Sequence, residues 1–359
     1  MLHPYFDHNR SVIHVQVRAP LAESSNMNNP TTIHITTPAP VSKLDAREEH
    51  FRIPSGIGSC EIFLRYLPAL ANAGSSRVVL YVHGATFPSA LSIAHRFDGR
   101  SWRDELVAAG YHVWGVDFLG FGESDLYPAM GLPAEANAPL GRTPEASRQI
   151  EQAVRFIASH HGLERVSIIA HSWGTIATGL FATGNPELVD RFVFFGPITL
   201  RQASGGQAPA FPPWRLVSVE DQRNRFVEDV PPGEPPVLSK HFDEWGKAYL
   251  ATDPESGTRS PASVKTPSGP IADIFAAWHG HLAYDPAGIK APTAIVRGEW
   301  DSLVTDADAR WLFDALNAAP TKRDLKIGRG THLMHLEENR YELYKEAQSF
   351  LDGRDRPAD

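Results

Sequence analysis

The chain has 359 residues, of which 42% are hydrophobic, 21% charged and 10% aromatic. These values are typical of a globular protein with a large apolar core, and they exclude a mainly disordered or collagen-like chain. Lys and Arg number 34 and Asp and Glu number 42, which gives a net charge of −8. Because the sequence has no basic run that could neutralise successive phosphates, we expect no nucleic-acid partner.

The single cysteine, Cys60, cannot form an intramolecular disulfide or a metal site built from cysteine pairs. The N-terminal sequence lacks the apolar stretch of about 7–15 residues that a signal peptide needs, and no window has the roughly 18 apolar residues of a membrane span. We therefore expect a cytoplasmic protein, with a periplasmic or secreted location left open if a leader has been removed. Residues 1–44 form a polar N-terminal arm, whose alternating runs at 13–17 and 33–35 predict either edge strands or a mobile segment.

Strand and helix patterns alternate from about residue 45 onward. Strands are predicted where β-branched and aromatic residues gather, at 60–66, 77–82, 112–118, 165–170, 191–195, 293–296 and 324–327. Helical patterns appear at 101–109, 174–183, 307–318 and 341–351. Another helix is predicted to have Thr143 as its N-cap and Pro144 at its first position, because apolar residues then recur at i, i+3, i+4 and i+7, namely Ile150, Ala153, Val154 and Ile157. The alternation predicts a mostly parallel sheet with helices on both faces.

The alternation stops between residues 201 and 284. This segment contains Pro, Gly and Ser clusters, yet it also carries more large aromatic residues than a linker would. We predict a partly helical cap subdomain, inserted into a core made of residues 45–200 and 285–359. The aromatic residues of the cap either line a pocket or pack the cap onto the core.

Residues 166–174 contain the most specific motif, an apolar strand that runs into Ala170-His171-Ser172-Trp173-Gly174 and then a helix. A serine between small residues at this position sits on a tight turn that exposes its hydroxyl, the nucleophile elbow. The sequence here resembles the α/β-hydrolase superfamily, with alanine in place of the usual first glycine. The resemblance implies a mostly parallel eight-stranded sheet flanked by helices, with Ser172 as nucleophile.

The superfamily supplies its acid and its base after later strands, in the order Ser, Asp or Glu, His. Gly298-Glu299-Trp300-Asp301 resembles its acid turn and points to Asp301 as the acid, with Glu299 as a local competitor. Residues 328–337 resemble its histidine loop and point to His332 as the base. His335 is expected to pack at the start of the last helix.

Acyl transfer also requires N–H donors for the oxyanion. The resemblance implies the backbone N–H of Trp173, after the nucleophile, and that of Ala85 in the His83-Gly84-Ala85 loop. His171 is expected to pack beside the nucleophile rather than act as a base. Candidate pocket residues come from this loop, the elbow and the cap, namely Thr86, Phe87, His171, Trp214, Trp245 and Trp278.

No cofactor and no metal is expected. The glycines of residues 117–124 lack the third glycine and the ribose-binding acid of a dinucleotide site, so this loop is assigned to the pocket floor. The histidine pairs at 160–161 and 279–281 lack companion ligands at metal spacing.

The leading hypothesis is a serine hydrolase that cleaves a carboxylic ester of a small, uncharged, apolar or aromatic substrate through an acyl-enzyme. Amide or peptide cleavage of the proline iminopeptidase type, lactone hydrolysis, thioester hydrolysis and carbon–carbon bond hydrolysis remain alternatives, because fold and motif do not fix the substrate. A non-catalytic ligand receptor on the same fold is the alternative from another class. The partner is a small molecule, and a homo-oligomer is compatible with the sequence.

Overall fold

A computed structural model describes residues 42–70, 77–135, 137–202, 209–234 and 240–353. The chain divides into two units, Met1–Val41 and Ser42–Asp359, and all described residues belong to the second. The strands predicted at 13–17 and 33–35 lie outside the described residues.

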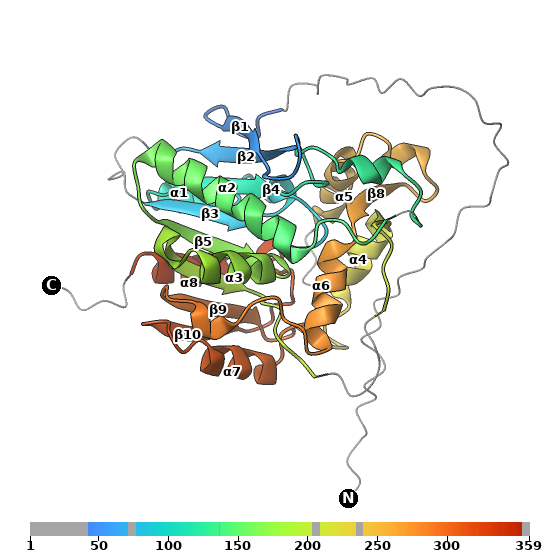
Figure 1. Cartoon of the computed structure of the whole chain (residues 1–359). Coiled ribbons are helices and arrows are strands. Elements are labelled where there is room, and N and C mark those ends of the chain that lie inside the picture. The colour runs from blue at the N-terminus through green and yellow to red at the C-terminus, as the bar shows by residue number, and fades with distance from the viewer. Residues whose placement is uncertain (1–41, 71–76, 136, 203–208, 235–239, 354–359) are drawn as a thin grey trace, which may run out of the picture. The chain divides into compact units, whose positions relative to one another are not determined.

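Eight of the described strands form one sheet with the order β1-β2-β4-β3-β5-β6-β9-β10 (Figure 1). β1 and β2 pair antiparallel, β2 is antiparallel to β4, and the other neighbours are parallel. The strand bounds are Glu49–Pro54, Glu61–Leu67, Val78–Val82, His112–Asp117, Val166–His171, Val189–Phe195, Thr293–Gly298 and Lys322–Ile327. The predicted mostly parallel eight-stranded sheet is thus confirmed.

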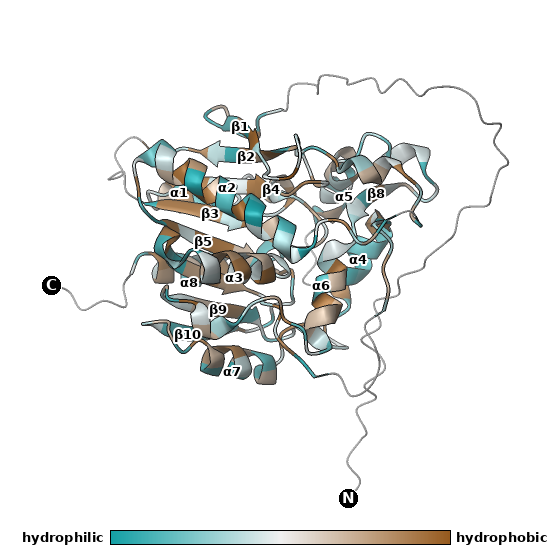
Figure 2. Cartoon of the chain, viewed as in Figure 1, coloured by the Kyte–Doolittle hydropathy of each residue, from teal (hydrophilic) through white to brown (hydrophobic). Residues whose placement is uncertain are grey.

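The central strands are buried on both faces, which is why they are short continuous apolar runs (Figure 2). On one face α1 and α8 pack against strand residues that include Tyr81 and Ile169. α2 and α3 contact each other, and α7 packs beside β10. The helix bounds in this core are Trp102–Ala108, Thr143–His161, Gly174–Gly184, Asp306–Ala315 and Arg340–Leu351 for α1, α2, α3, α7 and α8.

The start of α2 differs from the prediction by one position. The N-cap is Arg142, and Thr143 is already helical. The Thr143 hydroxyl donates to the carboxylate of Asp273, 2.7 Å away, instead of capping its own helix. The start of α2 is therefore tied to a carboxylate 130 residues further along the chain.

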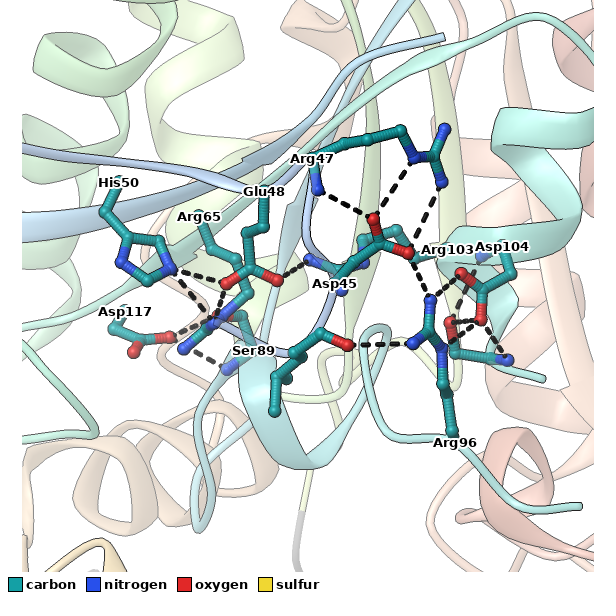
Figure 3. A network of polar contacts seen from close by, with 12 residues as sticks. Asp45, Arg47, Glu48, His50, Arg65, Ser89, Arg96, Arg103, Asp104 and Asp117 are labelled. Carbon is teal, nitrogen blue, oxygen red and sulfur yellow. Dashed lines mark hydrogen bonds and ion pairs between the residues drawn. The ribbon is translucent and has the colours of Figure 1, made fainter. Parts of the chain in front are cut away.

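A polar cluster fastens the edge strands to α1 (Figure 3). The carboxylate of Glu48 is fully buried and pairs with Arg65 of β2 and with Arg103 of α1, at 2.6 Å for Arg103. Arg96 joins the same region by pairing with Asp45 and Asp104, each at 2.7 Å. Removal of one member of such a buried pair leaves an uncompensated charge, which costs about 3–5 kcal/mol.

The chain between β6 and β9 forms a separate group of elements at the carboxyl ends of the parallel strands (Figure 1). Its described residues contain a two-stranded antiparallel sheet of β7 and β8 together with the helices α4, α5 and α6, where the sequence predicted only a partly helical insertion. The bounds of β7, α4, α5, β8 and α6 are Trp214–Ser218, Val219–Val227, Phe242–Ala251, Ser263–Pro267 and Gly269–Trp278. We call this group the cap. The predicted domain limits stay a prediction.

Candidate active site

Ser172 stands on the turn between β5 and α3. Its φ is +57°, which a residue with a side chain adopts only when its surroundings enforce it, and its N–H donates to Phe195 O at 3.0 Å. Gly174 is required here, because a Cβ at that position would lie 2.5 Å from the carbonyl oxygen of His83. Ala170 is fully buried in β5, so the turn accommodates the methyl group that replaces the usual glycine.

The structure brings together the three residues expected from the sequence. The Ser172 hydroxyl lies 2.8 Å from His332 Nε2, and His332 Nδ1 lies 2.9 Å from Asp301 Oδ2. A carboxylate only accepts, so Nδ1 carries the proton and Nε2 is left to accept from the serine. Ser172, His332 and Asp301 expose 6%, 3% and 4% of their surface, so other protein groups cover the chain of hydrogen bonds.

Asp301, and not Glu299, contacts the histidine. The second oxygen of Asp301 accepts the N–H of Leu303 at 2.9 Å, which fixes the carboxylate on its own turn. Glu299 instead accepts the N–H of Arg329 at 2.9 Å and so ties the acid turn to the histidine loop. The two competing acids are thereby separated by geometry.

Two backbone N–H groups beside Ser172 are available as donors. Among the described residues, the N–H groups of Ala85 and Trp173 donate to no other protein group. The Ala85 loop lies against the nucleophile, since a Cβ on Gly84 would be 3.1 Å from Ser172 Cβ. His83 holds the loop in place, because its Nδ1–H donates to Gly84 O at 2.7 Å and its Nε2 accepts from Phe118 N at 3.1 Å.

The sequence profile of the Hydrolase_4 family, described as serine aminopeptidase, S33, matches residues 77–339, more than half of the chain. The chain belongs to this family. Membership in the Hydrolase_4 family makes it a serine hydrolase of the α/β-hydrolase superfamily, as the elbow sequence had indicated. No curated protein matches the chain by sequence.

Solved structures of several hydrolases share the fold of this Hydrolase_4 member. A carboxylesterase of the thaumarchaeon Nitrososphaera gargenis is 14% identical, with a TM-score of 0.56, over 85% of this chain and 100% of that one. The 2-hydroxy-6-oxo-6-phenylhexa-2,4-dienoate hydrolase of a Rhodococcus species is 18% identical, with a TM-score of 0.55, over 85% and 98%. The thioesterase domain of a curacin biosynthetic pathway is 15% identical, with a TM-score of 0.54, over 85% and 99%. At such identities the likeness concerns the fold alone.

Asp273 of α6 is a residue of the site that the sequence did not point to. Its carboxylate accepts the indole N–H of Trp173 at 3.1 Å, the N–H and hydroxyl of Thr143, each at 2.7 Å, and the guanidinium of Arg142. The cap is therefore hydrogen-bonded directly to the residue that follows Ser172. No local signal could have found this contact, because Trp173 and Asp273 are 100 residues apart.

Two further histidines surround His332 in this Hydrolase_4 chain. His171 Nε2–H donates to the carbonyl of His332 at 3.0 Å, and its ring stacks on Phe195. His335 packs against His171 with 4.6 Å between ring centroids, and neither of its nitrogens has a hydrogen-bond partner within the described part of the chain. Burial lowers the pKa of His171 well below its usual value and that of His335 to about 3. Both rings are thus neutral, which avoids two extra positive charges beside the base.

Glu337 anchors the loop that carries His332. Its buried carboxyl accepts the hydroxyl of Thr331 and, at 3.3 Å, the N–H of the same residue. Burial raises its pKa to about 8, and the negative charges of Asp301 and Asp229 raise it as well. The carboxyl is therefore protonated at neutral pH. Its place five residues after His332 is a pattern that sequence reasoning passed over.

The predicted pocket residues occupy different surroundings. Phe87 and Trp245 lie in one buried apolar cluster, and the Trp245 indole N–H donates to Leu91 O at 3.0 Å, which is the packing alternative. Thr86 and Trp214 are half-buried, and Trp214 lies under the ammonium of Lys265. Trp278 exposes 9% and stacks under Arg201. Their contact with substrate stays a prediction.

Metal-binding clusters and membrane-spanning helices are both absent from the described residues. No group of three or more His, Cys, Asp or Glu side chains in them is arranged to hold a metal ion. None of the helices in the same residues is long and apolar enough to cross a membrane.

Proposed function

We propose that the chain cleaves a carboxylic ester of a small, apolar or aromatic substrate through an acyl-enzyme. The observation that carries the proposal is the continuous chain of hydrogen bonds from Ser172 through His332 to Asp301, next to two unoccupied N–H donors. A serine hydroxyl is a weak nucleophile at neutral pH and needs a base within this reach. The arrangement supplies that base and an acid that orients it.

In the proposed reaction Ser172 attacks the ester carbonyl, and His332 Nε2 takes the hydroxyl proton. The N–H groups of Ala85 and Trp173 stabilise the oxyanion, while Asp301 stabilises the imidazolium. His332 then gives the proton to the leaving alcohol, which leaves the acyl group on Ser172. A water molecule attacks this ester while His332 takes one of its protons, and His332 then returns that proton to the Ser172 oxygen as the free acid departs. No cofactor takes part in these steps.

Peptide cleavage is the second candidate, because the matching family is described as serine aminopeptidase. An aminopeptidase has to bind the α-ammonium group of its substrate, for which a carboxylate is the natural acceptor. Asp273, the cap carboxylate hydrogen-bonded to the elbow, already receives Arg142, Thr143 and Trp173. Asp273 is therefore not free to receive an ammonium group, and peptide cleavage would need another carboxylate for that purpose.

Labelling with a fluorophosphonate tests the proposal directly. We expect one covalent adduct on the wild type and none on Ser172→Ala, measured by intact mass. The same substitution should lower kcat for a hydrolysed p-nitrophenyl ester by about 10³-fold or more, as removal of a triad member does elsewhere. Near-normal turnover by Ser172→Ala would overturn the assignment, and a wild type without adduct or turnover would support the receptor alternative.

Parallel rates on matched substrates separate the bond types. p-Nitrophenyl esters, aminoacyl p-nitroanilides and lactones should be compared by kcat/KM on the same preparation. The proposal expects the esters to be the best substrates. A clear preference for the anilides would replace the ester hydrolase by an aminopeptidase with the same nucleophile.

A further inference from the structure

One arginine of the cap has no carboxylate partner. Arg201, Arg223, Arg225 and Arg259 each form an ion pair with an aspartate or a glutamate. Arg215 on β7 forms none within the described residues, and its Nε is buried without a hydrogen-bond partner.

The acid that acts electrostatically on Arg215 is already engaged. The carboxylate of Asp221 receives the N–H and the hydroxyl of Ser218, at 2.8 and 2.7 Å, and so closes the capping box of α4. A buried guanidinium without a counter-charge is costly, so such a group is retained where something else supplies the charge.

The register between β7 and β8 shows which way Arg215 faces. Arg215 pairs with Thr266, and Val217 pairs with Val264. Side chains two residues apart on a strand share a face, as do directly paired residues, so all four lie on one face of the two-stranded sheet. Val217 and Val264 belong to the buried cluster that contains Phe87 of the Ala85 loop and Leu333, which follows His332. Arg215 and Thr266 therefore lie on the face that is turned toward the site.

The end of the β7–β8 sheet at which Trp214 pairs with Pro267 contacts the loop after β4. Pro267, next to Thr266, packs so closely on Gly120 that a Cβ there would lie 2.5 Å from Pro267 Cγ. This loop also carries Phe118, whose ring lies against Trp173 at 5.2 Å between centroids. The strand pair that carries Arg215 thus packs against the Ala85 loop and the loop after β4, the two loops that flank Ser172.

The residue opposite Arg215 shares its lack of partners. Thr266 exposes 1% of its surface, and its Oγ1 has no hydrogen-bond partner among the described residues. Arg215 itself is half-buried, with its Nε enclosed by protein. Unpartnered polar atoms that are enclosed in this way are expected to bond to a molecule that reaches them.

We propose that Arg215, assisted by Thr266, binds a carboxylate carried by the substrate at the end remote from the scissile bond. The inference rests on the proposed function and narrows it to esters with an apolar body and one carboxylate. It replaces the uncharged substrate that the composition had suggested. A guanidinium fits a carboxylate through two parallel N–H···O bonds, which explains an arginine at this position better than a general apolar lining would.

The test compares two esters on each variant. p-Nitrophenyl hydrogen glutarate carries a terminal carboxylate, and p-nitrophenyl pentanoate has a chain of equal length without one. We expect the wild type to prefer the glutarate ester by tenfold or more in kcat/KM, mainly through KM. Arg215→Met should lower this ratio at least tenfold, and Arg215→Lys should restore part of it. The ratio within one preparation does not depend on the folded fraction.

Arg223→Met is the matched control, because Arg223 lies on the neighbouring α4 and is paired with Asp243 at 2.7 Å. It should leave the preference unchanged. A wild type that hydrolyses both esters equally, or an Arg215→Met variant that keeps the preference, overturns the inference while the ester hydrolase stands.

A binding measurement covers the case in which neither ester is cleaved and no fluorophosphonate adduct forms, so that the proposed function has failed. Calorimetry should then show glutarate bound by the Ser172→Ala protein and at least tenfold more weakly by Ser172→Ala with Arg215→Met. Equal binding by the two proteins, or none by either, would overturn the carboxylate site.

Discussion

At the scale of single residues, the site depends on close approaches that leave no room for a methyl group. Gly196, at φ +55°, follows β6, and a Cβ there would lie 3.0 Å from Cε1 and Nδ1 of His332. Gly196→Ala should push the imidazole away from Asp301 and Ser172 and strain its own backbone. We expect kcat to fall by about tenfold to a hundredfold, since misplacement by about 1 Å can cost about 10² in rate.

The control for this prediction is Gly184→Ala. Gly184 ends α3, and a Cβ on it would meet nothing within 4 Å. Fluorophosphonate labelling rates and kcat should be measured on both variants together with Tm. Unchanged kcat in a folded Gly196→Ala protein would mean that the imidazole position tolerates this displacement.

Motif residues were predictable because their constraints are local. The elbow forces small residues around Ser172, and the glycine turns after β9 and β10 place Asp301 and His332, so each can be read from about ten neighbouring positions. The choice of Asp301 over Glu299 rested on the spacing of a known turn. In the structure the N–H of Leu303 holds the Asp301 carboxylate, and the N–H of Arg329 holds that of Glu299. Asp273 escaped prediction because its partners come from two distant segments, the start of α2 and the elbow.

At the scale of elements, we expect the hydrogen bonds of Asp273 between α6 and the elbow to affect both the stability of the fold and kcat. Asp273 joins α6 to the start of α2 and to Trp173. Asp273→Asn keeps the size of the side chain but turns one acceptor oxygen into a donor that faces the N–H groups of these partners. We expect kcat to fall about fivefold to fiftyfold and the free energy of unfolding to fall by about 1–3 kcal/mol, because a buried donor loses its acceptor.

The comparison that isolates the catalytic part is a double-mutant cycle with Trp173→Phe, which removes the indole N–H. If Asp273 acts on the reaction by orienting Trp173, the losses in kcat of the two variants should not add. Asp243→Asn, an exposed aspartate of α5, serves as control. Fully additive losses in kcat would assign Asp273 to stability alone.

Elements with a strong period were predicted to within a few residues, whereas those held by tertiary contacts were not. β3 and β5 are buried runs that leave few alternatives. β1 is a half-buried edge strand, and β7 and β8 are five residues each, so neither composition nor period distinguishes them from loop. The pairing of β7 with β8 across the 44 positions of residues 219–262 is what makes them strands, and such a pairing is a property of the folded chain.

At the scale of the whole molecule, the buried carboxyl of Glu337 couples stability to pH. Burial raises its pKa from 4.5 to about 8 in the folded chain, with Asp301 and Asp229 adding to the rise. Between these two values the folded chain holds a proton that the unfolded chain has lost, so the free energy of unfolding falls as pH rises. The contribution is fully present below about pH 4.5 and is lost by about pH 8.

Glu337→Gln removes this titration and keeps an oxygen that accepts from Thr331. At about 1.36 kcal/mol per pKa unit, the wild type should lose on the order of 3–5 kcal/mol relative to Glu337→Gln between pH 4.5 and 8. Urea unfolding of both proteins across this range measures the difference, with the exposed neighbour in Glu338→Gln as control. Parallel curves for the wild type and Glu337→Gln would mean that Glu337 ionises normally. A widening gap would assign the loss of stability at alkaline pH to the ionisation of this carboxyl, which adds a negative charge near Asp301 and Asp229.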